Sequence, residues 1–170
     1  MGDGAKALVA RCACGNVVIE AAGAPIATVV CYCDDCQEAA RRLSVLPHLG
    51  PMAEKDGGTP YALFRKDRIR YAIGAAFLER HKLTEGSRTN RAIASCCNFP
   101  MLLEFEDSRH WVTFYRGAFR DGAPPLQWRI ATRFKPPDAE LPKDVPAYRS
   151  FPLGLVSRLV SARVAMMLGR

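Results

Sequence analysis

The chain of 170 residues lacks the features that would place it in a membrane or a secretory pathway. No apolar run approaches the length of a membrane-spanning helix, so we expect no membrane span. The residues after Met1 show no apolar core of the kind found in signal peptides, and Lys6 stands where an N-myristoylation signal needs Ser or Thr. Internal repeats and low-complexity blocks are also missing from the sequence. We therefore expect a globular cytoplasmic protein.

Acidic residues are in the minority, because 17 Asp and Glu face 24 Lys and Arg, which gives a net charge of +7. Such a chain suits an anionic partner, which could be nucleic acid, a membrane surface or a small thiol such as glutathione. Basic and aromatic side chains alternate between Tyr61 and Tyr71. That pattern occurs in single-stranded nucleic-acid sites, but also in an ordinary strand with its basic side chains outward. No nucleic-acid recognition module is visible, and we expect no nucleic-acid partner.

Histidine is scarce, and none of the three histidines has ligand spacing to a cysteine or to another histidine. We expect His81 and His110 to be surface or hydrogen-bonded side chains. His48 follows the middle group of cysteines, so it is the one histidine to examine near a metal.

Cysteine is the residue type that stands out, because all seven cysteines fall into three short groups. The groups are Cys12 and Cys14, then Cys31, Cys33 and Cys36, then Cys96 and Cys97. An odd number cannot pair completely, and disulfides are rare in a reducing compartment. Free thiols that fill a core would not cluster in this way. A redox role for Cys33 and Cys36 would need a strand-to-helix step in a βαβ unit, which the pattern does not predict. The clustering therefore indicates metal binding, and zinc is the expected ion.

Zinc thiolate sites usually have four ligands, so seven thiols divide naturally into four and three. Cys12 and Cys14 lie on a tight turn and need two distant partners, which Cys96 and Cys97 can supply. Such a site would staple an early hairpin to a late one. Adjacent cysteines chelate one ion only with a strained backbone, so one of this pair could instead complete the other site.

The middle group can wrap a second ion with three thiols. An open fourth position on that ion is typical of catalytic zinc, which binds water, hydroxide or a substrate thiolate there. Asp34 and Asp35 lie inside this group, where they could accept a proton or, as we favour, stabilise a turn.

The remaining sequence predicts a mainly β fold of short strands with a C-terminal helix. The β-prone runs are 7–12, 17–20, 27–30, 61–65, 69–73, 91–94, 101–105 and 111–115. A short helix is expected over 36–43 and a loop over 46–60. We expect a β domain over 1–122, a proline-rich extended segment over 123–152 that covers it, and a C-terminal amphipathic helix over 153–170.

The C-terminal helix carries an apolar face at spacings of three and four, formed by Leu153, Val156, Val160, Val164 and Met167. Burial of this face would fix the helix. We expect it to pack on its own domain or on a second copy in a homodimer, rather than on a membrane.

The motif order Cys-x-Cys-Gly, Cys-x-Cys-x-x-Cys and a late cysteine cluster resembles the glutathione-dependent formaldehyde-activating enzyme family, which includes centromere protein V. The resemblance covers about residues 10 to 120, the ordinary span of one domain. It implies a β-tent fold of short antiparallel sheets. It also implies that Cys12 and Cys14, with the late pair, hold a structural zinc, and that Cys31, Cys33 and Cys36 hold the functional zinc where glutathione reacts with formaldehyde.

The late motif departs from the family pattern Cys-x-x-Cys-Gly, because it reads Ser95-Cys96-Cys97-Asn98-Phe99. The chain resembles a separate branch, marked also by Tyr32, Asp35, Gln37 and Gly57-Gly58-Thr59. Two functions remain open at this point. One is a carbon–sulfur lyase that acts on a glutathione–formaldehyde adduct, with Cys31, Cys33 and Cys36 as the catalytic residues. The other is a non-catalytic binding module stabilised by zinc. Two ions with one open three-thiolate site favour the enzyme, and one closed site favours the module.

Overall fold

The computed structural model describes residues 7–50 and 52–170, and these residues form two β-sheets and two α-helices. The small sheet is antiparallel, with strand order β1-β2-β5. Its strands are β1 (Leu8–Arg11), β2 (Val18–Ala21) and β5 (Ile69–Ile73). The helices are α1 (Asp34–Leu43) and α2 (Leu153–Met167).

The large sheet has seven strands in the order β10-β3-β4-β9-β8-β7-β6. Its pairings are antiparallel except that of β10 with β3, which is parallel. In chain order the strands are β3 (Ala27–Cys31), β4 (Thr59–Arg65), β6 (Leu78–His81), β7 (Thr89–Ala94), β8 (Phe99–Phe105), β9 (Trp111–Tyr115) and β10 (Trp128–Ile130). Four short 3₁₀ turns occur at Lys66–Arg68, Ala75–Phe77, Arg116–Ala118 and Thr132–Phe134.

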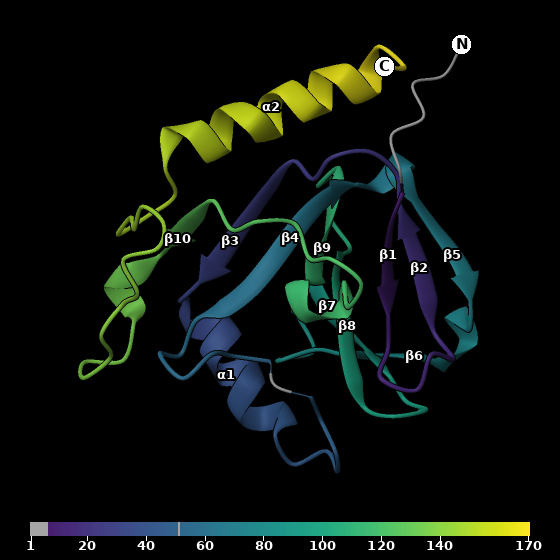
Figure 1. The fold of residues 1–170 in the computed structure, drawn as a ribbon, viewed down its shortest axis with the longest axis horizontal. Coiled ribbons are helices and arrows are strands. Elements are labelled where there is room, and N and C mark those ends of the chain that lie inside the picture. The colour runs from purple at the N-terminus through teal and green to yellow at the C-terminus, as the bar shows by residue number, and fades with distance from the viewer. Residues whose placement is uncertain (1–6, 51) are drawn as a thin grey trace.

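The large sheet is the central layer, since side chains from both of its faces are buried. Phe64, Leu102 and Phe114 point to one face and pack against the small sheet. Tyr61, Leu63 and Leu103 point to the other face, where α1 and α2 lie (Figure 1). Successive strand residues face opposite sides, so a strand buried on both sides reads as a continuous apolar run. The predicted mainly β class with a C-terminal helix is confirmed.

Two strands lie where the sequence did not indicate them. Strand β6, which includes His81, pairs with β7 at the edge of the sheet, although the β-prone runs did not include it. Strand β10 lies inside the proline-rich segment, and the sheet therefore extends beyond residue 122, where we expected the β domain to end. No proline occurs from Gln127 to Lys135, so the backbone N–H groups needed for pairing are available there.

The C-terminal helix forms where it was predicted, but another of its faces packs against the domain. Leu155 is buried at 2% exposure and Leu159 packs against the same core. The five residues of the predicted buried face, Leu153, Val156, Val160, Val164 and Met167, are all exposed. Of the two packing alternatives that we expected, packing on its own domain is therefore excluded, and packing on a second copy stays a prediction. Apolar residues recur at helical spacing on both sides of α2. The side that carries Leu155 and Leu159 faces the large sheet.

None of the helices in the described residues is long and apolar enough to cross a membrane.

Candidate metal centres and the adjoining cavity

Four thiols converge where two distant hairpin turns meet. Cys12 and Cys14 come from the turn between β1 and β2, and Cys96 and Cys97 from the turn between β7 and β8. The Cys12 Sγ atom lies 3.5 Å from that of Cys14 and 3.8 Å from that of Cys96, and the Sγ atoms of Cys14 and Cys96 are 3.3 Å apart. In a tetrahedral zinc site with Zn–S bonds of about 2.3 Å, sulfurs lie about 3.8 Å apart. This four-thiol cluster could hold a metal ion.

The adjacent Cys96–Cys97 pair enters the cluster without left-handed backbone at either cysteine. The residue that follows, Asn98, takes the left-handed conformation with φ 52°. Its side-chain Nδ2 donates to the carbonyl of Pro47 at 2.8 Å, which holds the turn. The expected strain is therefore at Asn98, a residue type that tolerates this conformation. Both cysteines belong to the four-thiol cluster, so neither completes the other group.

One thiol of this cluster is readily deprotonated. A backbone hydrogen bond from Asn16 and the thiol of Cys96 lower the pKa of Cys14 to about 7. The backbone N–H of Val17 donates to the Cys12 sulfur at 3.3 Å. Hydrogen bonds of this kind stabilise thiolates, the form in which cysteine binds a metal.

The other three thiols lie at the step from β3 to α1. Cys31 is the last residue of β3, Cys33 immediately precedes α1, and Cys36 lies in its first turn. The Sγ atoms of Cys33 and Cys36 are 3.3 Å apart, and the Tyr61 hydroxyl donates to the Cys36 sulfur at 3.4 Å. This three-thiol cluster could also hold a metal ion. Strand β3 does lead directly into a helix, but β3 and β4 are antiparallel, so the step is not part of a βαβ unit.

The surroundings of the three-thiol cluster favour negative charge on Cys33. The thiols of Cys31 and Cys36, followed by the Cys36 backbone N–H and the charge of Arg91, lower the pKa of Cys33 to about 3. Hydrogen bonding to Cys33 and Cys36, together with burial, raises the pKa of Cys31. The N-terminus of α1 also favours a thiolate, because its free N–H groups and dipole are positive.

Among the residues that the structure describes, no fourth Cys, His, Asp or Glu joins the three-thiol cluster. His48 is exposed and belongs to neither cluster. Asp34 and Asp35 form the first turn of α1 with exposed side chains, which agrees with a local structural role. The structure thus groups the seven thiols as four and three.

A cavity of about 480 Å³ adjoins the three-thiol cluster. Its lining comes from strands of the large sheet and from Leu155 and Leu159 of α2, which close one side. Most of its wall is apolar, and its polar groups include Arg91, Arg109 and Asp35. The apolar lining is formed by Val29, Leu63, Leu103, Phe105, Trp111, Ile130, Phe151, Leu155 and Leu159. A largely apolar cleft of this size with a few polar groups is typical of a small-molecule site.

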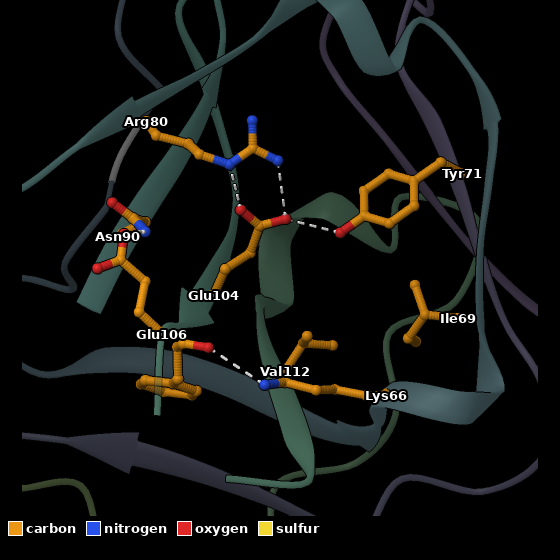
Figure 2. A pocket seen from close by; sticks show the side chains of 9 residues that line it. Lys66, Ile69, Tyr71, Arg80, Asn90, Glu104, Glu106 and Val112 are labelled. Atoms are coloured by element: carbon orange, nitrogen blue, oxygen red, sulfur yellow. Dashed lines mark hydrogen bonds and ion pairs between the residues drawn. The ribbon is translucent and has the colours of Figure 1, made fainter. Parts of the chain in front are cut away.

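A second cavity of about 460 Å³ lies on the opposite face of the large sheet and contains no cysteine. Figure 2 shows that three of its polar side chains, Arg80, Glu104 and Tyr71, are joined to one another, and that Lys66 is bonded to a backbone carbonyl. Glu104 accepts hydrogen bonds from Arg80 and from the Tyr71 hydroxyl, and the Lys66 Nζ donates to the carbonyl of Phe105 at 3.2 Å. The three-thiol cluster thus lines the first cavity and not the second.

Arg129 on β10 is a residue of this region that the sequence analysis missed. It is buried and donates to both carboxylate oxygens of Asp144, at 3.0 and 3.1 Å, and to Asp56 at 3.2 Å. It also donates to the hydroxyl of Tyr32, which lies between Cys31 and Cys33. Gln37 adds two further bonds from its Nε2, to the carbonyl of Tyr32 at 2.6 Å and to that of Phe134 at 2.7 Å. These bonds hold the proline-rich segment against the three-thiol loop.

Comparison with known proteins agrees with the motif resemblance over part of the chain. Residues 7–46 match the model of the glutathione-dependent formaldehyde-activating enzyme family. This matched segment contains the first two cysteine groups. The fold is similar to a crystal structure of a Rhodobacter sphaeroides protein, with a TM-score of 0.50 and 16% identity. That similarity covers 82% of this chain and 99% of the other. No curated protein matches the chain. The predicted likeness to this family is thus confirmed for the segment that carries Cys12, Cys14, Cys31, Cys33 and Cys36.

Proposed function

We propose that this protein is a zinc-dependent enzyme that makes or breaks the carbon–sulfur bond between a small thiol and an aldehyde, as the name of the matching family suggests for glutathione and formaldehyde. The observation that carries the proposal is the three-thiol cluster, which has no fourth protein ligand among the described residues and adjoins a cavity. In the proposed reaction the thiol sulfur adds to the aldehyde carbon, and the aldehyde oxygen receives the proton that the thiol loses. The reverse reaction breaks the same bond.

The two clusters have different roles in this proposal. Cys12, Cys14, Cys96 and Cys97 would hold a structural zinc, because four thiols complete a tetrahedral site. Cys31, Cys33 and Cys36 would hold the functional zinc. When bound there, zinc supplies a positive charge that lowers the pKa of a coordinated thiol.

The chain's own residues prepare the second site. The Tyr61 hydroxyl and the N-terminus of α1 stabilise negative charge on the cysteine sulfurs. The apolar wall of the cavity keeps water away from the reacting groups, and the covering α2 residues Leu155 and Leu159 contribute to it. Confinement of thiol and aldehyde in one cavity also lowers the entropic cost of their encounter.

A non-catalytic zinc module is the alternative from a different class. One closed site would support that module, whereas a four-thiol group and a three-thiol group beside a cavity support the enzyme. The proposal also places the protein in the cytoplasm, where free thiols such as these stay reduced.

Two matched substitutions test the proposal. We expect Cys36→Ser to abolish thiol-dependent aldehyde consumption, measured by NMR of the hydroxymethyl thioether product, while the protein stays folded with one zinc per chain. Cys12→Ser should instead reduce soluble, folded protein, because it opens the four-thiol site. Metal content by mass spectrometry should be two zinc ions per wild-type chain. Wild-type protein with two zinc ions and no turnover of any thiol–aldehyde pair would support the module instead.

A further inference from the structure

Arg91 on β7 is a buried cation, and two of its three side-chain nitrogen atoms have no hydrogen-bond acceptor among the described residues. Its side chain is 2% exposed, and it lines the cavity beside the three-thiol cluster. The Nη2 atom donates to the backbone carbonyl of Asp35 at 3.1 Å. The Nε and Nη1 atoms have no partner in the described part of the chain. A guanidinium buried with two free donors is costly unless an anion compensates it.

The neighbouring protein groups do not supply that anion by direct bonding. Among the described residues Arg91 forms no ion pair with a carboxylate, and Asp35, which also lines the cavity, has an exposed side chain. The Cys33 thiolate is close enough to be stabilised by the charge of Arg91, but no hydrogen bond joins the two. The hydroxyl of Tyr115, another buried group on this face of the sheet, also lacks a partner.

The other cation of the cavity wall is already occupied. Arg109 lies over the ring of Phe105 at 4.3 Å and pairs with Asp107 at 3.4 Å. Its side chain is also substantially exposed. Arg91 is therefore the buried cation of the wall that is free to bind an incoming anion.

The rest of the wall limits what that ligand can be. Most of the lining is aliphatic or phenyl side chain, including Phe151, Leu155 and Leu159, which form no hydrogen bonds with a ligand. The uncharged polar side chains of the wall are Tyr61, Thr89, Trp111 and Thr113. Outside the three-thiol cluster, Arg91 is the only buried charge among the described residues of this wall, because Asp35 and Arg109 are exposed. A ligand with several charges, such as glutathione with its two carboxylates and one ammonium, would therefore find one buried partner and lose hydration at its other charges. A carboxylate matches a guanidinium in shape, because two parallel N–H donors meet two oxygens. In Arg91 such a pair consists of Nε or Nη1, which have no partner, and the second N–H of Nη2, whose other N–H is bonded to Asp35.

We propose that the cavity binds an apolar molecule with one carboxylate, that Arg91 holds this carboxylate, and that the thiol substrate is therefore an apolar carboxylic thiol rather than glutathione. The last step rests on the proposed function, since it takes the sulfur of the ligand to react at the three-thiol cluster. Binding of the carboxylate itself does not depend on that reaction.

The first experiment measures binding without any thiol or turnover. The probes are 4-phenylbutyrate and its uncharged amide, tested by calorimetry on the purified wild-type chain. We expect the carboxylate to bind at least about tenfold more tightly than the amide, because charge-assisted hydrogen bonds are strong in an apolar site. Arg91→Met and Arg91→Gln should both remove this preference, Arg91→Lys should restore part of it, and Arg109→Met should keep it.

Folding and metal content are measured on the same variants. We expect Arg91→Met to melt no lower than wild type, because it removes a buried charge that lacks a direct partner. Equal binding of acid and amide to the wild type would overturn the proposal. A carboxylate preference that survives in Arg91→Met and Arg91→Gln would also overturn it. Loss of metal from both variants, with no acid preference in wild type, would show instead that Arg91 only balances the cysteine thiolates.

A second experiment separates this proposal from the function on which it rests. Formaldehyde consumption is compared with 3-mercapto-3-phenylpropanoate, its amide and glutathione as the thiol. We expect the carboxylic thiol to be used best by wild type and its advantage over the amide to be lost in Arg91→Gln. Carboxylate binding without any turnover would contradict the enzyme function alone. Turnover that is fastest with glutathione and unchanged in Arg91→Gln would contradict the assignment of Arg91 alone.

Discussion

At the scale of single residues, Gly58 shows how closely the backbone around the three-thiol cluster is packed against the start of β4. A Cβ atom at this position would lie 2.4 Å from Cγ1 of Val30 and 2.6 Å from Cζ of Tyr32. Both neighbours are fully buried, and they flank Cys31 in the chain. The Gly57-Gly58 pair, which we expected within a loop over 46–60, therefore provides room for the backbone that carries the thiols.

We expect Gly58→Ala to destabilise the protein by about 1–3 kcal/mol, because an added methyl group in a packed core forces its neighbours to move. Urea unfolding followed by circular dichroism measures the change. Gly86→Ala is the matched control, because a Cβ atom there meets no atom within 4 Å. Similar stabilities for the two variants would contradict the packing described at Gly58.

Arg129 is a second residue whose role depends on its burial. It is 2% exposed and pairs with Asp144, Asp56 and Glu54, so its removal leaves acidic groups without their counter-charge. We expect Arg129→Met to cost about 3 kcal/mol, the lower end of the usual effect of breaking a buried ion pair. Asp56, at 9% exposure, would be left buried without its partner, whereas Asp144 and Glu54 are partly exposed and can be solvated. Arg133→Met should change the stability by less than about 0.5 kcal/mol, because Arg133 is exposed and lies over the ring of Phe134. Thermal melting of both variants measures these stability changes. A small effect of Arg129→Met would contradict the role of Arg129 in holding the proline-rich segment against the three-thiol cluster.

At the scale of elements, α2 joins the domain mainly through its N-terminal half. Leu155 is buried over the cavity, and Arg158 lies over the ring of Trp128 at 4.6 Å and donates to Gln127 Oε1 at 2.7 Å. At the other end, Arg65 Nη1 donates to the carbonyl oxygen of Arg170 at 2.6 Å. The opposite face, from Leu153 to Met167, remains exposed, and it is the face on which we still expect a second copy to pack.

Two truncations on α2 distinguish its faces. We expect Leu155→Ala to cost about 2–5 kcal/mol in helix docking, because it leaves a void above the cavity. Val156→Ala, on the exposed face, should change the stability by less than about 0.5 kcal/mol. Chemical denaturation gives the stability, and binding of an apolar fluorescent dye reports whether the cavity has opened. Equal effects from the two substitutions would mean that α2 does not dock as described.

At the scale of the whole molecule, the four-thiol cluster joins the two sheets. Its ligands come from the β1–β2 turn of the small sheet and the β7–β8 turn of the large one, over eighty residues apart in sequence. A metal ion at this point would restrict the unfolded chain and stabilise the contact between the two layers.

We therefore expect removal of metal to loosen the whole fold. A loss of about 4 kcal/mol would lower the melting temperature by about 8–16 °C in a chain of this size. The measurement is thermal melting by circular dichroism before and after chelation, with the metal-free state verified by mass spectrometry and zinc added back as the control. An unchanged melt in verified metal-free protein would rule out a structural metal.

Much of the fold class follows from local patterns that the sequence carries directly. Short β-prone runs predicted most strands, and the breaker-free stretch after Cys36 predicted α1 to within two residues of its start. The spacing of the cysteines within each group also predicted which thiols are neighbours along the chain. These features depend on residues close together in sequence, so periodicity and turn chemistry suffice to predict them.

Other features were decided only when distant segments came together. The sequence could not show that Cys97 joins Cys12 and Cys14, that β10 pairs with β3, or that Leu155 rather than Val156 faces the sheet. It also gave no sign that Arg91 is buried beside the thiols, because an arginine in a strand is ordinarily exposed. In each case the outcome depends on which surfaces pack against each other, and burial is a property of the assembled layers rather than of a local run of residues.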